Sequence, residues 1–374
     1  MSRALAPPGR ASALLAGLVL LAGCGSDAGP VSASASDGPT DPAACPSLLP
    51  GVAARRDGPP GDQTVPVDRR LVLMGGGLEV DEATLSFLAA ARGGDVVVLR
   101  ASGSTSSYND YFLSALEGDS LPASTTTLRV PASSTAASSP GVLCRVGRAE
   151  GIWLAGGDQW DYLGGWAGPL HDSVAATAIR GKAVGGTSAG AMVLGEVAFA
   201  ATFGGVTSAE ALAAPTAAEV TVRISAMSQP ELRGVLVDSH FHARDREGRL
   251  LAFLAQGRAL LGRDTLRGIG IDERTALVVR DGLYHVHAVG AGVVSLYEVT
   301  GDAVLEPGRA LGLTGIRRLH LRDGDRGAWP PAFPAGVATA ELRVVDGVVR
   351  VVQPPPPPTS GAPAPEAAAA DRFR

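Results

Sequence analysis

Residues 182–194 read KAVGGTSAGAMVL, a short apolar run, a Gly-Thr-Ser-Ala-Gly segment and a helix-like sequence. This order predicts a strand, a sharp turn and a helix, with Ser188 at the turn. Glycines on either side let the backbone turn tightly, so the serine hydroxyl would stand exposed above a sheet. The backbone N–H groups that follow would point toward a developing oxyanion. The segment therefore predicts a serine nucleophile in an α/β fold.

Apolar runs alternate with helix-like segments before this motif. Continuous aliphatic runs at 70–74, 95–99 and 151–155 are typical of strands buried on both faces, and 81–92 and 169–180 have helical patterns. The sequence predicts an α/β fold, a three-layer sandwich with a mainly parallel sheet. Glycine-rich loops follow several of these strands, and open α/β sheets bind ligands at that edge.

The pattern changes after about Thr275. Short β-like runs at 276–279 and 284–289 are separated by Asp-Gly and Gly turns, which predicts an added antiparallel β portion near the C-terminus. Asp346 and Gly347 lie between two further β-like runs and predict a hairpin. No linker separates this portion, so residues 66–352 are expected to form a single domain.

The N-terminus has the pattern of an export signal. Arg3 and Arg10 precede an apolar run that is too short for a permanent transmembrane helix. The small residues before Cys24 resemble a bacterial lipobox. That resemblance implies a signal peptide at 1–23, lipid attachment to Cys24 and an extracytoplasmic protein anchored to a bacterial membrane or cell surface. The alternative is an ordinary signal peptide with an incidental cysteine.

Two segments of low complexity flank the predicted domain. Residues 24–65 are rich in Ser, Ala, Gly, Pro and Asp and predict a flexible spacer after the anchor. Residues 353–374 contain a proline run and an alanine run and predict a disordered tail. A recognition role for the proline run is the alternative.

Composition narrows the classes of function. The net charge of −5 gives no support to nucleic-acid binding. With Cys24 assigned to lipid, Cys45 and Cys144 remain, and they could form a disulfide in an oxidising compartment or stay as two free or buried thiols. The oligomeric state is open, with a homodimer as one alternative.

A serine nucleophile needs a base and a group that orients the base. His240 follows the apolar run 235–237, and Glu273 follows a second short apolar and glycine stretch, so both are expected at the ends of strands. A metal site is the alternative for the histidines. His242 with His240, and His285 with His287, alternate as neighbours on one side of a strand would, but no Cys cluster or His-Glu-x-x-His motif accompanies them.

At this point the sequence resembles a known family, the cyanophycinases and related serine peptidases of family S51, which have a flavodoxin-like core related to class I glutamine amidotransferases. Four blocks in order carry the resemblance, and with two shorter glycine loops they cover roughly residues 71–279. The blocks are Gly156-Gly157-Asp158-Gln159, residues 186–191, Asp238-x-His240-Phe241-x-x-Arg244-x-Arg246-x-x-Arg249-Leu250, and residues 268–276.

The resemblance implies roles for individual residues. Ser188 would be the nucleophile, His240 the base and Glu273 the residue that orients His240. Oxyanion donors would be the backbone N–H groups of Ala189 and of Gly76 or Gly77. The glycines have an alternative role, which is to permit a tight connection between strand and helix. The order Ser, His, Glu differs from that of α/β-hydrolase esterases, in which the acid precedes the histidine.

The resemblance also implies substrate-binding residues. Guanidinium groups bind carboxylates through two hydrogen bonds, as an aspartate-rich substrate would require. The alternative is a solvated helix face on which the arginines pair with neighbouring acids. The residues concerned are Gln159, Asp238, Arg244, Arg246 and Arg249.

Taken together, the sequence predicts an exported, lipid-anchored serine peptidase that works through an acyl-enzyme without metal or other cofactor. The substrate implied is multi-arginyl poly-aspartate, cleaved to β-aspartyl-arginine dipeptides. Three alternatives stay open: an aspartyl dipeptidase of the same family, a non-catalytic binding lipoprotein on the same fold, and a metal-dependent amidohydrolase that uses the histidine pairs.

Overall fold

The computed structural model describes residues 44–118, 121–330, 333 and 339–353. The predicted signal peptide, the lipidation site Cys24 and nearly all of the predicted tail therefore lie outside the described residues. Within the described part, no helix is long and apolar enough to serve as a transmembrane span.

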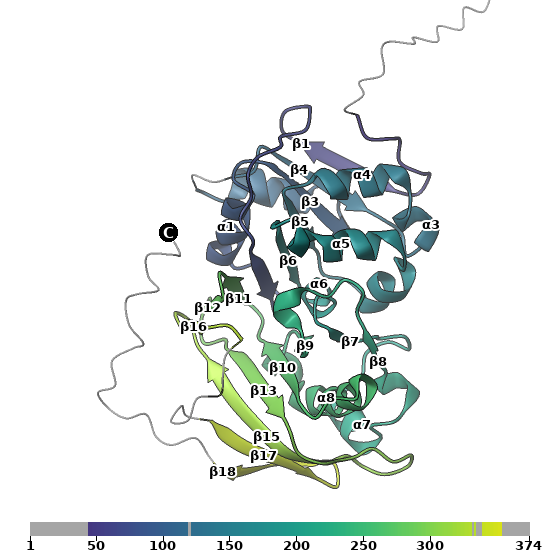
Figure 1. The fold of residues 1–374 in the computed structure, drawn as a ribbon, viewed down its shortest axis with the longest axis vertical. Helices are drawn as coiled ribbons and strands as arrows, with labels where there is room; N and C mark the ends of the chain where they lie inside the picture. Colours follow the sequence, from purple (N-terminus) through teal and green to yellow (C-terminus); the bar gives the residue numbers. More distant parts are fainter. Residues whose placement is uncertain (1–43, 119–120, 331–332, 334–338, 354–374) are drawn as a thin grey trace, which may run out of the picture. The chain divides into compact units, whose positions relative to one another are not determined.

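The first sheet is parallel in its middle and antiparallel at both margins (Figure 1). The neighbours β4, β3, β5, β6 and β2 run parallel, which confirms the predicted α/β fold. In spatial order the strands are β1 (Ala53–Asp57), β4 (Ser124–Arg129), β3 (Asp95–Arg100), β5 (Gly151–Leu154), β6 (Ala183–Thr187), β2 (Leu71–Met74), β11 (Thr275–Arg280), β12 (Leu283–Ala288) and β16 (Arg326–Ala328).

Helices cover both faces of this sheet because its central strands are apolar on both sides. Leu71 and Leu73 of β2 pack in one apolar cluster with α4 (Pro140–Arg148) and α5 (Pro169–Ile179). The alternate residues Val72 and Met74 pack in another cluster with α1 (Asp81–Ala90). Successive strand residues point to opposite faces, so one short strand contributes to two cores. The result is the predicted three-layer sandwich.

A second sheet follows in the chain and is mostly antiparallel, with β7, β9 and β10 parallel to one another. Helix α8 (Glu247–Leu261) packs against it through a third apolar cluster. Its strands in order are β18 (Val348–Gln353), β17 (Ala340–Val345), β15 (Gly312–Leu321), β13 (Val294–Val299), β10 (Leu266–Ile271), β9 (Val235–Asp238), β7 (Val197–Phe199) and β8 (Val222–Ile224), with β14 (Ala303–Val304) paired to β15.

The added antiparallel portion is confirmed, but its strands are divided between the two sheets. The runs at 276–279 and 284–289 fall in β11 and β12, which extend the first sheet rather than the second. The predicted hairpin is present as β17 and β18, with Asp346 and Gly347 both at positive φ. A two-residue turn of this kind matches the twist of the strands it joins.

The prediction of a flexible spacer at residues 24–65 is wrong for residues 45–65. Strand β1 pairs antiparallel with β4 at the margin of the first sheet, and a disulfide joins Cys45 to Cys144 of α4. Backbone pairing at a sheet edge needs few apolar side chains, which explains why a segment with the sequence AARRD was not recognised as a strand. Residues 45–65 thus belong to the folded unit.

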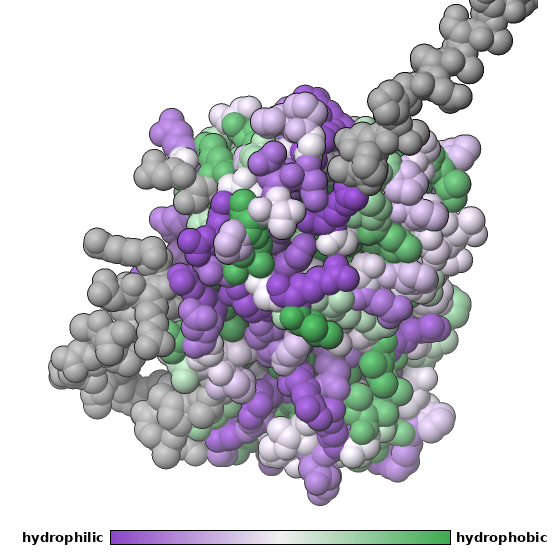
Figure 2. Space-filling view, turned by 45° about the horizontal axis from the view of Figure 1, so that its top comes forward, coloured by the Kyte–Doolittle hydropathy of each residue, from purple (hydrophilic) through white to green (hydrophobic). Residues whose placement is uncertain are grey.

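Short helical segments connect these elements. They are α2 (Ser107–Asp110), a π-helix (Tyr111–Ala115), α3 (Ser134–Ala137), a second π-helix (Asp161–Gly165), α6 (Ala189–Met192), α7 (Ser208–Ala213), and 3₁₀ turns at Ala218–Val220, Pro230–Leu232 and His242–Arg244. On the face shown in Figure 2, hydrophilic and hydrophobic residues are interspersed where the surface is coloured.

Candidate active site

Ser188 occupies the tight turn between β6 and α6 that the sequence predicts. Its backbone has φ 52° and ψ −121°, a conformation that costs energy for a residue other than glycine. A Cβ at Gly190 would lie 2.1 Å from the carbonyl oxygen of Leu154, and one at Gly186 would lie 2.6 Å from the carbonyl carbon of Gly190. The two glycines of the motif are therefore required because backbone packs directly on backbone.

His240 and Glu273 come from the second sheet. Strands β9 and β10 are parallel, with Asp238 paired to Gly270, so the residues that follow them emerge at the same edge. His240 also has a positive φ of 47°, and its N–H donates to the carbonyl of Gly75 at 2.7 Å. The end of β2 in the first sheet thus holds the histidine that the second sheet supplies.

The three predicted side chains form one hydrogen-bonded series. Ser188 Oγ lies 2.8 Å from His240 Nε2, and His240 Nδ1 lies 2.6 Å from Glu273 Oε1. A carboxylate accepts a hydrogen bond from Nδ1–H, and this leaves the lone pair of Nε2 facing the serine hydroxyl. The arrangement can therefore withdraw a proton from Ser188.

Burial keeps the base in the neutral form. It lowers the pKa of the His240 imidazole, and the hydrogen bond to Glu273 opposes this effect. The positive charges of Arg244 and Arg246 lower the pKa of His240 further. Because only the neutral imidazole can accept a proton, His240 is poised as a base at neutral pH.

The residues predicted as oxyanion donors lie next to the three catalytic side chains. Ala189 is the first residue of α6, where a backbone N–H has no acceptor within the helix. Gly76 lies against the imidazole, since a Cβ there would be 2.4 Å from His240 Cε1, and its carbonyl accepts the N–H of Arg274 at 2.9 Å. Gly77 is exposed and lies next to Glu273. Close packing against His240 thus explains why residue 76 is a glycine. The oxyanion role of the backbone N–H groups of Ala189, Gly76 and Gly77 stays a prediction.

Asp238 and Arg249 were predicted to line the substrate site, and burial contradicts this. Asp238 has no exposed surface and Arg249 is 2% exposed. The Asp238 carboxylate accepts from Arg249 Nε at 2.8 Å and Nη2 at 2.5 Å, while the guanidinium lies over Phe199 and Phe253. The pair is an internal ion bridge between β9 and α8, with no surface for a substrate.

Arg246 belongs mainly to the same buried cluster. It donates to Asp238 Oδ1 at 3.3 Å and to the carbonyl of Ser239 at 2.8 Å, and burial lowers its pKa to about 10. Its function is therefore to secure the segment that carries His240.

Two predicted substrate residues keep accessible positions. Arg244 is exposed in the 3₁₀ turn after His240. Gln159 is partly exposed and donates from Nε2 to Met192 Sδ of α6 at 3.4 Å. Both lie beside the catalytic elements with polar groups available to a ligand.

The histidine pairs predicted as an alternative metal site are not brought together. His242 Nδ1 pairs with Asp272 at 2.7 Å, while the rings of His285 and His287 lie 3.9 Å apart and His287 pairs with Glu82. Within the described ranges, no three His, Cys, Asp or Glu side chains are placed to hold a metal ion.

Sequence reasoning missed two groups near the site. Asp272 pairs with His242 immediately beside the His240–Glu273 pair, and it raises the pKa of His242. Glu79 follows the Gly75–Gly77 loop, accepts a hydrogen bond from the Tyr108 hydroxyl, and has its pKa raised to about 7 by burial. Asp272 lies inside the recognised block 268–276 and Glu79 lies just after the Gly75–Gly77 loop, and this proximity was the only available signal.

The fold and this constellation define the class of site, a serine nucleophile with a histidine base and a glutamate on an α/β scaffold. Comparison with known proteins shows a more specific similarity, to cyanophycinases. The chain is 33% identical over 188 residues to a cyanophycinase of Geminocystis herdmanii, which covers 48% of this chain and 63% of the relative. It is 33% identical over 192 residues to a cyanophycinase of Synechococcus elongatus, and this alignment covers 49% of this chain and 54% of the relative. These matches confirm that this part of the chain is cyanophycinase-like.

The extent of the similarity is limited. The chain spans between half and two thirds of the length of these curated relatives. A solved structure of a peptidase from an acI-B1 Actinobacterium aligns with 71% of this chain and 98% of its own, at 19% identity and a TM-score of 0.45. No family model matches the chain.

Proposed function

We propose that the protein is a serine peptidase that acts through an acyl-enzyme. The observation that carries this proposal is the hydrogen-bonded series from Ser188 Oγ through His240 to Glu273 Oε1. His240 Nε2 takes the hydroxyl proton as Oγ attacks a substrate carbonyl carbon, and the imidazolium then gives that proton to the leaving amine. Water, deprotonated by the same imidazole, releases the acyl group and restores the serine.

The proposed substrate is aspartate-rich, namely multi-arginyl poly-aspartate cleaved to β-aspartyl-arginine dipeptides. Similarity to cyanophycinases supports this choice. Arg244 is the exposed guanidinium beside His240 and could pair with a substrate carboxylate, and Gln159 offers an amide next to α6. Removal of aspartate from short peptides is the alternative for the same site.

We further propose that the protein acts outside the cytoplasm, anchored through lipid on Cys24. Residues 1–24 support this by their sequence pattern. The disulfide between Cys45 and Cys144 supports it independently, because such bonds persist mainly in oxidising compartments. An exported enzyme would meet external polymer or peptide rather than a store inside the cell.

The test is incubation of the purified protein with insoluble cyanophycin, followed by chromatography of released dipeptides. Ser188→Ala should abolish release, while Ser173→Ala, which removes a hydroxyl on α5 away from the site, should not. A parallel reaction with amino-terminal aspartyl dipeptides separates the two substrate classes. Equal release by Ser188→Ala and the native chain would exclude the serine mechanism. Activity that a chelator abolishes and serine reagents spare would instead favour the metal-dependent alternative.

A further inference from the structure

The segment that joins β2 to α1 is bonded to all three loops of the Ser188 site. Its consecutive carbonyl groups at residues 74–76 accept backbone N–H groups from Ser188 at 3.0 Å, His240 at 2.7 Å and Arg274 at 2.9 Å, in that order. Arg274 directly follows Glu273. The nucleophile, the base and the acid are therefore tied to one short run of backbone.

This segment has little stiffness of its own beyond residue 76. Gly76 and Gly77 both have positive φ, and Gly77 and Leu78 are exposed. The chain is fixed again at Glu79, whose carboxyl group turns inward, and at Val80, which is buried in the apolar cluster of α1. The position of the three carbonyl groups thus depends on β2 at one end and on Glu79 and Val80 at the other.

Glu79 is held by a hydrogen bond from a separate element. Its Oε1 accepts from the hydroxyl of Tyr108 in α2. Its Oε2 is shielded from solvent, and no group in the described part of the chain donates to it. Burial raises the pKa of Glu79 to about 7, and the hydroxyl groups of Tyr108 and Thr187 oppose this effect. Burial and the charge of Glu79 also raise the pKa of Tyr108, so the phenol remains a donor.

The pair of Glu79 and Tyr108 lies on the buried side of the nucleophile turn. Thr187, which directly precedes Ser188, faces the side of the first sheet that α1 covers. The Trp153 ring packs on the same face, and its centroid lies 6.4 Å from that of the Tyr108 ring. Glu79 is thus placed to support the turn from behind.

The charge state of Glu79 decides how well it fits this position. Among the described residues, no cation contributes to the pKa of Glu79. Arg100 acts on Tyr108 instead, with its guanidinium 5.9 Å from the ring centroid, and Asp81 accepts a hydrogen bond from Tyr111. An ionised Glu79 would therefore leave a buried oxygen with neither a donor nor a counter-charge, which is costly. The protonated carboxyl group avoids this cost.

We propose that Glu79 is a positioning residue of the Ser188 site. While its carboxyl group is neutral, the bond to Tyr108 anchors the segment at 74–79, and ionisation releases that segment. The proposal rests on the proposed function, in which Ser188 is the nucleophile. Release withdraws the carbonyl acceptors from the three loops, so Ser188 loses its base as pH rises through about 7. Because His240 must also be neutral and its pKa is lowered from 6.5, the reactive range lies between these two values.

The test is the rate at which a fluorophosphonate reagent labels the purified full chain, followed by mass spectrometry. Ser188 Oγ displaces fluoride from phosphorus while His240 takes the hydroxyl proton, so the rate reports on the nucleophile without a peptide substrate. Labelling of the native chain should slow about tenfold between about pH 6.5 and about pH 8.5. Glu79→Gln, which stays neutral and can still accept from Tyr108, should keep its rate over that range.

Two further variants remove the anchor itself. Glu79→Ala should be labelled about tenfold more slowly than the native chain at about pH 6.5, because small misplacements of catalytic groups are costly. Tyr108→Phe removes only the hydroxyl donor and keeps the ring contacts with Phe112 and Trp153, so it should fold normally and also be labelled more slowly. Circular dichroism would check the fold of each variant.

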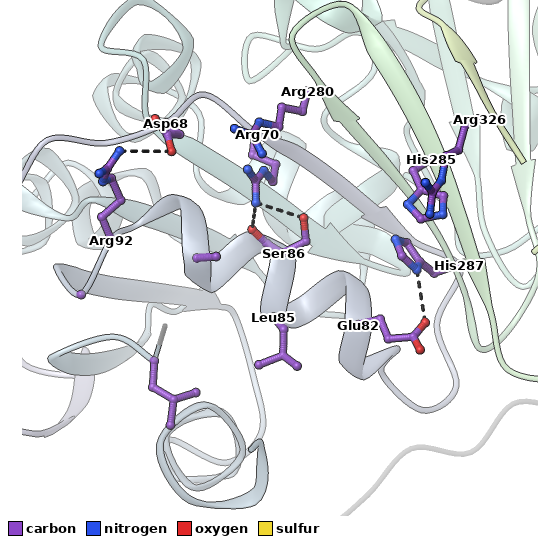
Figure 3. A pocket seen from close by; sticks show the side chains of 13 residues that line it. Asp68, Arg70, Glu82, Leu85, Ser86, Arg92, Arg280, His285, His287 and Arg326 are labelled. Atoms are coloured by element: carbon purple, nitrogen blue, oxygen red, sulfur yellow. Dashed lines mark hydrogen bonds and ion pairs between the residues drawn. The ribbon is translucent and has the colours of Figure 1, made fainter. Parts of the chain in front are cut away.

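Glu82→Gln is the matched control. Glu82 lies on the first turn of α1, but its side chain is 75% exposed and pairs with His287 at 3.2 Å. It lines a cavity of about 830 Å³ beside α1, and neither Glu79 nor Tyr108 lines that cavity (Figure 3). Its labelling rate should match that of the native chain at every pH.

The outcomes separate this proposal from the proposed function. No labelling of Ser188 in the native chain would overturn both. Equal labelling of the native chain and Glu79→Ala, or an alkaline loss of rate that Glu79→Gln does not remove, would overturn the role of Glu79 alone. A native rate that stays constant above about pH 7 would do the same.

Discussion

Gly76 lies directly against the imidazole of His240, and a single added carbon at Gly76 would be 2.5 Å from Nε2, the atom that faces Ser188. The base is therefore seated on a backbone that tolerates no side chain. A loop at the end of β2 in one sheet thus sets the position of a histidine carried by the other.

Gly76→Ala should displace the imidazole and reduce kcat/KM by about 100-fold or more, because small misplacements of a catalytic base are costly. The matched control is Gly282→Ala. Gly282 has a similar positive φ of 71° but nothing within 4 Å of the added carbon. Both variants should lose stability from backbone strain, and only Gly76→Ala should lose activity. Equal activity of the two variants would contradict the packing argument.

Glu273→Gln should lower kcat by about 10²–10⁴-fold, because an amide no longer fixes the tautomer or stabilises the imidazolium. The fold should be retained, since the Glu273 side chain is 40% exposed. Steady-state kinetics with circular dichroism would check this prediction. Glu306→Gln, a surface substitution on a pair with Arg309, is the control. An unchanged kcat in Glu273→Gln would remove Glu273 from the mechanism.

The pH profile of kcat/KM should have an acidic limb centred below pH 6.5. The pKa of His240 is lowered from that value, and the base must be neutral, so activity is lost as pH falls through the lowered pKa. Arg244→Gln should move the limb to higher pH, because the positive charge of Arg244 lowers the pKa of His240. A limb centred above pH 7 in the native chain, or no movement in the variant, would argue against this origin.

Asp238→Asn should destabilise the protein by about 3–5 kcal/mol, because it leaves the Arg249 guanidinium buried without its carboxylate. Urea unfolding of this variant can be compared with that of Glu306→Gln, whose exposed pair should contribute less than about 1 kcal/mol. If Asp238→Asn kept full stability and only raised KM, the substrate-binding role would be restored and the structural role abandoned.

Removal of the disulfide by Cys45→Ser with Cys144→Ser should cost about 2–5 kcal/mol of unfolding free energy. The bond joins residues 99 apart and closes the N-terminal segment onto α4. Thermal unfolding of the native chain with and without reductant should show the same difference, and the double variant should be insensitive to reductant. Equal melting temperatures throughout would show that β1 pairing alone holds this segment.

Several features could be predicted because their cause is local. Continuous aliphatic runs predict the buried parallel strands, and the Asp346-Gly347 pair predicts the hairpin of β17 and β18. Both predictions depend only on residues that are neighbours in the sequence. The glycines at 186 and 190 mark the Ser188 turn because that turn excludes any side chain at those positions. His240 and Glu273 were found because each follows an apolar run, and strand ends are where such sheets place their chemistry.

Other features could not be predicted because they depend on partners distant in the chain. The segment at 53–57 becomes a strand only because the edge of β4 is available, and Cys45 meets Cys144 only after that pairing. Asp238 and Arg249 look like surface ligands in the sequence, yet they neutralise each other inside the protein when α8 packs on β9. The cavity beside α1 likewise exists only where α1 lies beside β12 and β16.

The chain on its own thus determined the α/β class, the nucleophile turn and the three side chains of the site. The tertiary structure alone decided which charges are buried, how two sheets share one site, and where a second cavity opens. The reason is that turns and strands follow from steric preferences of adjacent residues, whereas burial and charge pairing are set by elements that meet only in the folded protein.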